Sequence, residues 1–171
     1  MPTLRTTDGH DVQISARDRA LVRAYSWYTV VVSGIRYVQA YAGTGRSDTR
    51  KIYMHRLVLG AKKGQTVDHK DRNGLHNNRR NLRLATKAQN NINSTKRRSA
   101  SGFKGVKRNS TAKRTPSWVA ELRVKGRMVH VGCYPTAEVA ARAYDAMVRR
   151  VYGAFGNASL NFPTAKEKVR A

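Results

Sequence analysis

The sequence predicts an α+β protein built from two parts, and three observations lead to this prediction. Short β-rich runs bounded by glycine and asparagine turns recur along the 171 residues. One long run at helical spacing stands near the C-terminus, over residues 136–152. Residues 94–102, STKRRSASG, are small, polar and basic, which is typical of a linker. We place the linker at residues 96–101, between a part of residues 1–95 and a part that starts at residue 102.

The first 60 residues predict short elements in a mixed order. Residues 11–27 indicate a short strand and then a short helix that Ser15 is placed to cap. The run YTVVVSGIRYVQAY, residues 28–41, predicts a hairpin that turns at Ser33-Gly34. KIYMHRLVLG then predicts a strand that leads into a helical turn ending at Gly60.

The segment of residues 64–95 is unusually rich in asparagine. Val67-Asp68-His69 ends a short predicted strand, and Asn73-Gly74 is a turn signal. Residues 82–84 alternate as a second strand does. Thr86 is placed to cap a short helix that carries Asn90.

The second part predicts a three-stranded antiparallel sheet packed on one helix. The strands are expected at residues 103–108, 117–124 and 127–134, with a turn at Lys125-Gly126. Thr136 is a natural N-cap, and Gly153 is expected to end the helix. The apolar positions at helical spacing predict its core face: Ala140, Ala143, Tyr144, Met147 and Val151.

Charge is the largest compositional signal. The chain carries 34 Lys and Arg against 10 Asp and Glu, a net charge of +24, with a pI of about 11.2. Residues 1–95 hold 17 basic and 6 acidic residues, which gives +11, and residues 96–171 hold 17 and 4, which gives +13. Such a charge favours a polyanionic partner, and nucleic acid fits best because neutralised phosphates release counterions.

Other features of the composition narrow the classes of protein. Cys133 is the single cysteine, so no internal disulfide and no multi-cysteine zinc site are expected. The apolar runs are too short for a membrane span, and no signal-peptide core precedes them. We therefore expect a cytoplasmic protein with no membrane partner and no small-molecule substrate. We expect a monomer and leave a dimer open.

Asp68, His69, Asn81 and Asn90 form the candidate chemical site. Carboxylate and amide oxygens are hard ligands that suit Mg²⁺ or Mn²⁺. An imidazole beside them can accept a proton from water near neutral pH. Hydrolysis of a phosphodiester needs both a base for the attacking water and a cation for the developing charge.

The string VDHKDRNGLHNNRRNLRLATKAQNNINS, with MHRLVLG upstream, resembles the motif of HNH endonucleases in the form found in phage and intron homing enzymes. The resemblance covers roughly residues 53–95 and implies a ββα-metal fold. It also implies that His69 is the general base and that Asp68 and Asn90 hold the metal. Asn81 would orient His69 or brace the loop.

The other polar residues of this region have plainer interpretations. His76 is expected in a loop, and His55, in the HR pair, is expected to brace the fold or contact phosphate. The histidines and Cys133 are scattered and lack ligand spacing, which argues against zinc. Three asparagines are favoured as turn and loop formers rather than ligands: Asn73, Asn77 and Asn78.

Residues 102–163 resemble the plant ethylene-response-factor (Apetala-type) DNA-binding domain, on the strings GVKR, WVAELR, AARAYD and LNFP in that order. The resemblance implies a sheet that lies in the major groove with the helix behind it. Met128 and His130 stand where that family has Arg and Trp, so its base preference is not carried over. Residues 164–171 would form a basic tail. The residues expected to contact DNA are Lys96, Arg97 and Arg98 in the linker, and Lys104, Lys107, Arg108, Glu121, Arg123, Arg127 and His130.

The two resemblances together predict a site-specific, metal-dependent endonuclease that acts on double-stranded DNA and belongs to a phage or mobile element. One alternative is a non-catalytic DNA-binding regulator with a degenerate nuclease, against which the intact Asp68, His69 and Asn90 argue. A second is an RNA-binding module, but the sequence lacks the exposed aromatic platform of single-strand readers.

Overall fold

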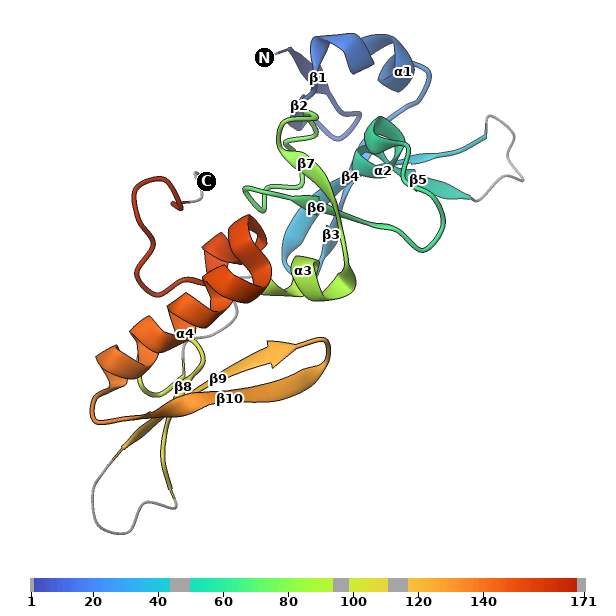
Figure 1. Cartoon of the computed structure of the whole chain (residues 1–171). Coiled ribbons are helices and arrows are strands. Elements are labelled where there is room, and N and C mark those ends of the chain that lie inside the picture. Colours follow the sequence, from blue (N-terminus) through green and yellow to red (C-terminus); the bar gives the residue numbers. More distant parts are fainter. Residues whose placement is uncertain (1, 44–49, 94–98, 111–116, 169–171) are drawn as a thin grey trace. The chain divides into compact units, whose positions relative to one another are not determined.

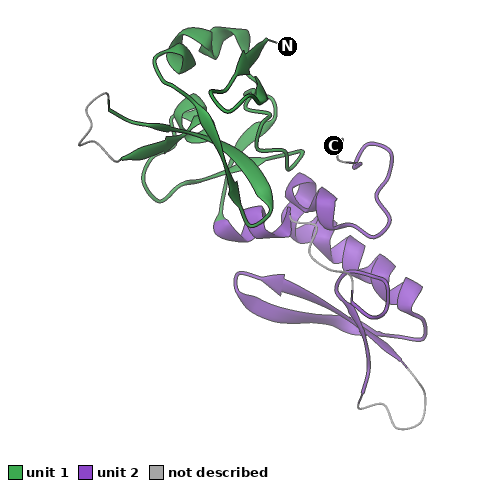
Figure 2. Cartoon of the chain, turned by 180° about the vertical axis from the view of Figure 1, so that it is seen from behind, with its two compact units in different colours: residues 1–86, 171 green, residues 87–170 purple. Residues whose placement is uncertain are grey.

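The computed structural model describes residues 2–43, 50–93, 99–110 and 117–168. The chain divides into two compact units, residues 1–86 with 171, and residues 87–170 (Figure 2). Both are mixed α+β with small antiparallel sheets, which confirms the predicted class. The division falls after Thr86, ahead of the linker expected at 96–101, of which residues 96–98 lie outside the described residues.

The first unit opens with two small antiparallel sheets (Figure 1). The hairpin between β3 and β4 turns at Ser33 and Gly34, which both have positive φ (51° and 81°), as a two-residue type I′ turn requires. Its elements are β1 (Thr3–Arg5) paired with β2 (Asp11–Gln13), and β3 (Tyr28–Val32), β4 (Ile35–Tyr41) and β5 (Lys51–Tyr53) in that order. The described helices of this unit are short: η1 (Ala16–Asp18), α1 (Arg19–Arg23) and α2 (Met54–Leu59), of which α2 packs on β4 and β5.

A third pair of strands carries the candidate site. β6 (Thr66–His69) and β7 (Leu82–Ala85) are antiparallel, with Asp68 opposite Arg83 and His69 opposite Leu82. The long loop between them packs on β4 at Gly74, where a Cβ atom would lie 2.2 Å from the Arg36 carbonyl oxygen. Glycine is therefore required here because another backbone approaches closely.

One buried apolar cluster joins these elements. Trp27 is the largest buried side chain of this cluster and donates its indole N–H to the carbonyl of Val22 at 2.7 Å. The cluster includes Val67 from β6 and Leu82 from β7, so the site strands are anchored in the core of the unit. The other members are Val12, Ile14, Val22, Val38, Ala40, Met54 and Val58.

The second unit contains the predicted three-stranded antiparallel sheet packed on a C-terminal helix (Figure 1). The side chain of Thr136 caps the helix by accepting the Val139 N–H at 3.2 Å, as expected. The first strand starts at residue 106 and not at 103, since Gly105 passes against the Tyr144 ring in a left-handed conformation (φ 70°). The elements are α3 (Lys87–Ile92), β8 (Val106–Arg108), β9 (Trp118–Val124), β10 (Arg127–Tyr134), α4 (Ala137–Tyr152) and η2 (Gly153–Ser159), with the sheet order β10-β9-β8.

The buried face of α4 differs in part from the expected one. Val148 is fully buried, while Val151 is 38% exposed, so the apolar stripe ends one turn earlier than predicted. Asp145 is also buried, and its carboxylate accepts the backbone N–H groups of Asn161 and Phe162 at 2.9 and 2.7 Å. This buried carboxylate holds the returning LNFP segment against the helix. Among the described residues, no helix is long and apolar enough to cross a membrane.

Candidate active site and DNA interface

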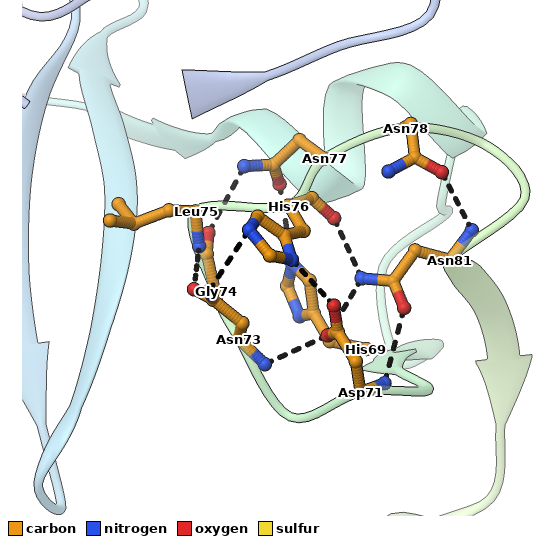
Figure 3. Close-up of polar contacts among 9 residues, drawn as sticks. All are labelled: His69, Asp71, Asn73, Gly74, Leu75, His76, Asn77, Asn78 and Asn81. Carbon is orange, nitrogen blue, oxygen red and sulfur yellow. Dashed lines mark hydrogen bonds and ion pairs between the residues drawn. The ribbon is translucent and has the colours of Figure 1, made fainter. Parts of the chain in front are cut away.

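His69 lies at the end of β6 and is 5% exposed. Its Nε2 atom is 3.3 Å from Oδ1 of Asn77. The amide nitrogen of Asn77 donates to the carbonyl of Gly74 at 3.0 Å, which turns Oδ1 toward the imidazole (Figure 3). Because an amide oxygen only accepts, Nε2 carries the proton of the neutral ring and Nδ1 is the basic nitrogen.

The surroundings of His69 keep its imidazole neutral. Burial lowers the pKa of His69, and the contact with Asn77 and the charges of Asp71 and Asp68 only partly oppose that effect. A base must be unprotonated to accept a proton, so a lowered pKa leaves it ready at neutral pH.

Asn81 braces the loop between β6 and β7. Its amide nitrogen donates to Oδ1 of Asp71 at 2.9 Å and to the carbonyl of His76 at 2.8 Å, and its oxygen accepts the Asp71 N–H at 3.1 Å (Figure 3). Asp71 also pairs with Nδ1 of His76 at 2.6 Å. The amide beside His69 thus belongs to Asn77, which the sequence favoured only as a loop former. The HNN run that begins seven residues after His69 was the signal for it.

The carboxylate of Asp68 is 4% exposed and is paired across the two strands with Arg83. Both Nε and Nη2 of Arg83 lie 2.8 Å from Oδ2 of Asp68. The Arg83 side chain is itself largely buried, at 14% exposure. Sequence reasoning did not single out Arg83, because only the strand register identifies its partner.

His55 contributes a second buried imidazole. It lies at the start of α2, stacks on Tyr53 at 5.3 Å between ring centroids, and meets the His69 ring edge-on at 5.1 Å. Its Nδ1 atom is buried without a hydrogen-bond partner in the described part of the chain. Burial lowers the pKa of His55 to about 3, so its ring is neutral.

Asn90 lies on α3, in the second unit, and is half-buried. Its amide makes no hydrogen bond to the described residues, so its oxygen is available as a ligand. Carboxylate and amide oxygens are the kind of ligand that Mg²⁺ and Mn²⁺ prefer. Among residues 2–43, 50–93, 99–110 and 117–168, no three His, Cys, Asp or Glu side chains gather as a metal cluster.

The residues expected to contact DNA fall on different surfaces of the second unit. Alternation along β9 turns Ala120 and Leu122 toward α4, and Glu121 and Arg123 to the outer face. Cross-strand register adds three residues to that outer face, since Lys107 pairs with Val119, His130 with Glu121, and Met128 with Arg123. Lys107 and Glu121 also form an ion pair at 2.9 Å.

The other expected contacts lie elsewhere. Arg108 pairs with Trp118 and Arg127 with Val124, so both have the register of the face that packs on α4. Lys104 precedes β8, and its ammonium group donates to Oγ of Ser159 at 3.0 Å. Lys96, Arg97 and Arg98 lie outside the described residues.

Comparison with known proteins gives a relative for most of the chain. Over 141 residues the chain is 33% identical to an uncharacterized HNH endonuclease of Acanthamoeba polyphaga mimivirus. The match spans 79% of this chain and 67% of the viral protein. The chain belongs to the HNH endonuclease family. This confirms the resemblance inferred from residues 53–95.

A part of this HNH protein also resembles plant transcription factors. It is 48% identical over 63 residues to dehydration-responsive element-binding protein 1J of Oryza sativa, which covers 35% of the chain and 24% of the plant protein. It is 42% identical over 67 residues to an ethylene-responsive transcription factor of Arabidopsis thaliana, 38% of the chain and 33% of that protein. The chain therefore spans a third or less of these plant proteins. The sheet on one helix fits their type of DNA-binding domain. No family model and no solved structure matches the chain.

Proposed function

We propose that this HNH protein is a site-specific endonuclease that hydrolyses a phosphodiester bond of double-stranded DNA with a divalent metal. The observation that carries the proposal is His69, a buried neutral imidazole beside the Asp68 carboxylate at the end of β6. The HNH relative and the net charge of +24 support the same activity and the same substrate.

Each residue has one task in the proposed reaction. Asn77 holds the His69 ring so that Nδ1 can take a proton from the attacking water. Asn81 and Asp71 hold the loop that carries Asn77. Asp68 and Asn90 would hold Mg²⁺ or Mn²⁺, which supplies positive charge for the phosphate and the leaving oxygen. By resemblance to the family, the products are a 5′-phosphate and a 3′-hydroxyl.

In this proposal, the second unit recognises the target sequence in the DNA. The outer face of β9 and β10 offers Arg123, Glu121, His130 and Met128 in two adjacent rows. A sheet of this kind fits the major groove, where the donor and acceptor pattern of each base pair is distinct. A phage or mobile-element enzyme that cuts one site would need such a reader.

A non-catalytic DNA-binding regulator is the second candidate. The observation that favours it is the ion pair of Asp68 with Arg83, since a carboxylate already paired with a cation does not need a metal. Both candidates bind DNA, so cleavage separates them.

The experiment is plasmid cleavage by the purified chain. A pool of supercoiled plasmids with random inserts is incubated with the protein and Mg²⁺ or Mn²⁺, and nicked circles and linear product are separated on a gel. We expect cleavage that EDTA stops without unfolding the protein. His69→Ala should lose roughly 10²–10⁴-fold in rate while it still binds DNA, which is the usual value of general-base catalysis.

His10→Ala is the matched control, because His10 lies near the β1–β2 turn and contacts Asp8 and Thr6 rather than the site. It should cleave at the wild-type rate. DNA binding without cleavage in either metal would favour the regulator, and wild-type cleavage by His69→Ala would remove His69 from the mechanism.

A further inference from the structure

The carboxylate assigned to the metal is already paired with a buried cation. Two nitrogens of Arg83 lie 2.8 Å from Oδ2 of Asp68, and both side chains are largely buried. In such surroundings each charge needs a partner, because an isolated buried charge is strongly unfavourable. A divalent metal that binds Asp68 therefore meets a carboxylate that already has a guanidinium partner.

Metal and guanidinium compete for the same carboxylate. A cation with two charges placed on Asp68 lies within a few ångströms of Arg83, where like charges repel strongly at the low effective dielectric of a partly buried site. The guanidinium then leaves Oδ2 and can bind another anion. In the proposed reaction the anion that arrives is the DNA phosphate, whose oxygens match the fork of an arginine side chain.

We propose that Arg83 is the resident counter-ion of Asp68, that the divalent metal displaces it, and that the displaced guanidinium binds a DNA phosphate at the cleavage site. The inference rests on the proposed function and adds to it a DNA-binding residue. It makes metal and DNA binding mutually dependent: the metal binds weakly to the free protein and more tightly once DNA has provided a partner for Arg83.

The test measures Mn²⁺ binding by electron paramagnetic resonance, and so does not depend on cleavage. Arg83→Met removes the charge but keeps a long side chain on β7. We expect it to bind Mn²⁺ about tenfold more tightly than the wild type in the absence of DNA, since the competing cation is gone. Arg80→Met is the matched control, because Arg80 is exposed in the loop just before β7 and its loss changes the net charge equally. It should leave Mn²⁺ affinity unchanged.

A second arm adds a duplex of arbitrary sequence at low salt, with Asp68→Asn measured in parallel to subtract Mn²⁺ held by the DNA. The duplex should raise the Mn²⁺ affinity of the wild type, and this coupling should shrink in Arg83→Met. Arg83→Gln gives a second uncharged variant if Arg83→Met does not fold, as judged by circular dichroism. Arg83→Lys keeps the charge and should bind Mn²⁺ as the wild type does.

The outcomes separate the two proposals. If Arg83→Met and Arg83→Gln bind Mn²⁺ no more tightly than the wild type, the metal does not displace Arg83 from Asp68. This conclusion would hold even if the wild type cleaves DNA. If the duplex raises the Mn²⁺ affinity of Arg83→Met as much as that of the wild type, the displaced guanidinium does not bind a DNA phosphate. If Arg83→Met binds Mn²⁺ more tightly and DNA no longer raises that affinity, the inference is supported. If the wild type then fails to cleave DNA, only the proposed nuclease activity is wrong.

Discussion

The imidazole of His69 combines two features that a general base needs. Asn77 determines which nitrogen carries the proton, and burial keeps the ring unprotonated. The neighbouring charges of Asp68 and Asp71 act in the opposite direction but do not outweigh burial. The proposed role of His69 as a base therefore depends on its burial as much as on its imidazole group.

The first prediction concerns the pH dependence of cleavage. Since burial lowers the pKa of His69 below its ordinary value of 6.5, the active neutral form persists as the pH falls. The acidic limb of kcat/KM, which reports groups of the free enzyme, should lie below pH 6.5. The measurement is a series of initial cleavage rates from pH 4.5 to 8 at constant ionic strength. An acidic limb above pH 6.5 would mean that another group titrates.

The second prediction concerns His55 and stability. Its pKa is about 3 in the folded protein and about 6.5 in the unfolded chain. Protonation of His55 therefore favours unfolding. The contribution of neutral His55 to the free energy of unfolding is fully present above pH 6.5 and is lost as the pH falls toward 3. The loss is up to about 1.4 kcal/mol per pH unit from this one group.

Thermal unfolding at several pH values tests this expectation. His55→Phe keeps an aromatic ring for the contacts with Tyr53 and His69, so its melting temperature should depend less steeply on pH between 4 and 6.5. His10→Ala serves as the control histidine variant. Equal slopes for His55→Phe and the wild type would show that His55 does not carry the effect.

At the level of elements, the alternation of β9 determines which of its residues face the proposed DNA interface. Side chains alternate along β9, so Ala120 and Leu122 face α4, and Glu121 and Arg123 lie on the outer face. Arg123 donates to the carbonyl of Gly126 at 3.1 Å, which holds its side chain near the β9–β10 turn. A planar guanidinium in a held position suits a guanine edge.

The third prediction tests this face. Arg123→Ala should weaken binding to the preferred duplex by roughly 1–3 kcal/mol and leave random DNA nearly unaffected. Arg127→Ala is the control, since Arg127 has the opposite register on the neighbouring strand and should weaken both duplexes alike. Binding titrations on both duplexes at two salt concentrations give the answer. If Arg123→Ala weakens binding to the preferred and the random duplex equally, Arg123 contacts phosphate rather than a base.

At the level of the whole molecule, the helix that follows β7 belongs to the second unit. Ile92 of α3 packs on the core of that unit, and Oγ of Ser159 donates to the Ile92 carbonyl. The helix of the HNH motif thus shares a core with the candidate DNA reader.

The fourth prediction follows from this packing. A fragment of residues 87–171 should be more stable than one of residues 102–171, by about 1–2 kcal/mol for the partly buried isoleucine. Urea unfolding of the two fragments measures the difference. Both should shift duplex DNA at low salt and release it as salt rises, as expected for a strongly basic binder. Equal stability would mean that α3 is not part of the second fold.

Much of the architecture was predictable because it depends on local pattern. The hairpin of β3 and β4, the β6 and β7 pair, and the sheet on α4 followed from alternation, turn residues and the Thr136 cap. β1 was missed because three residues carry too little pattern, and its pairing with β2 is a tertiary choice. η2 was missed because Gly153 reads as a helix end, although the chain continues in a 3-10 helix.

By itself the sequence determined the charge, the family motif and the order of the elements, since each is a property of residue types at short spacing. Tertiary structure alone decided the partners: Asn77 rather than Asn81 beside His69, Arg83 on Asp68, and Arg127 on the opposite face from Arg123. These choices depend on strand register and on how a long loop closes. A shift of one residue in register turns every side chain of a strand to the other face, and short-range patterns do not contain that information.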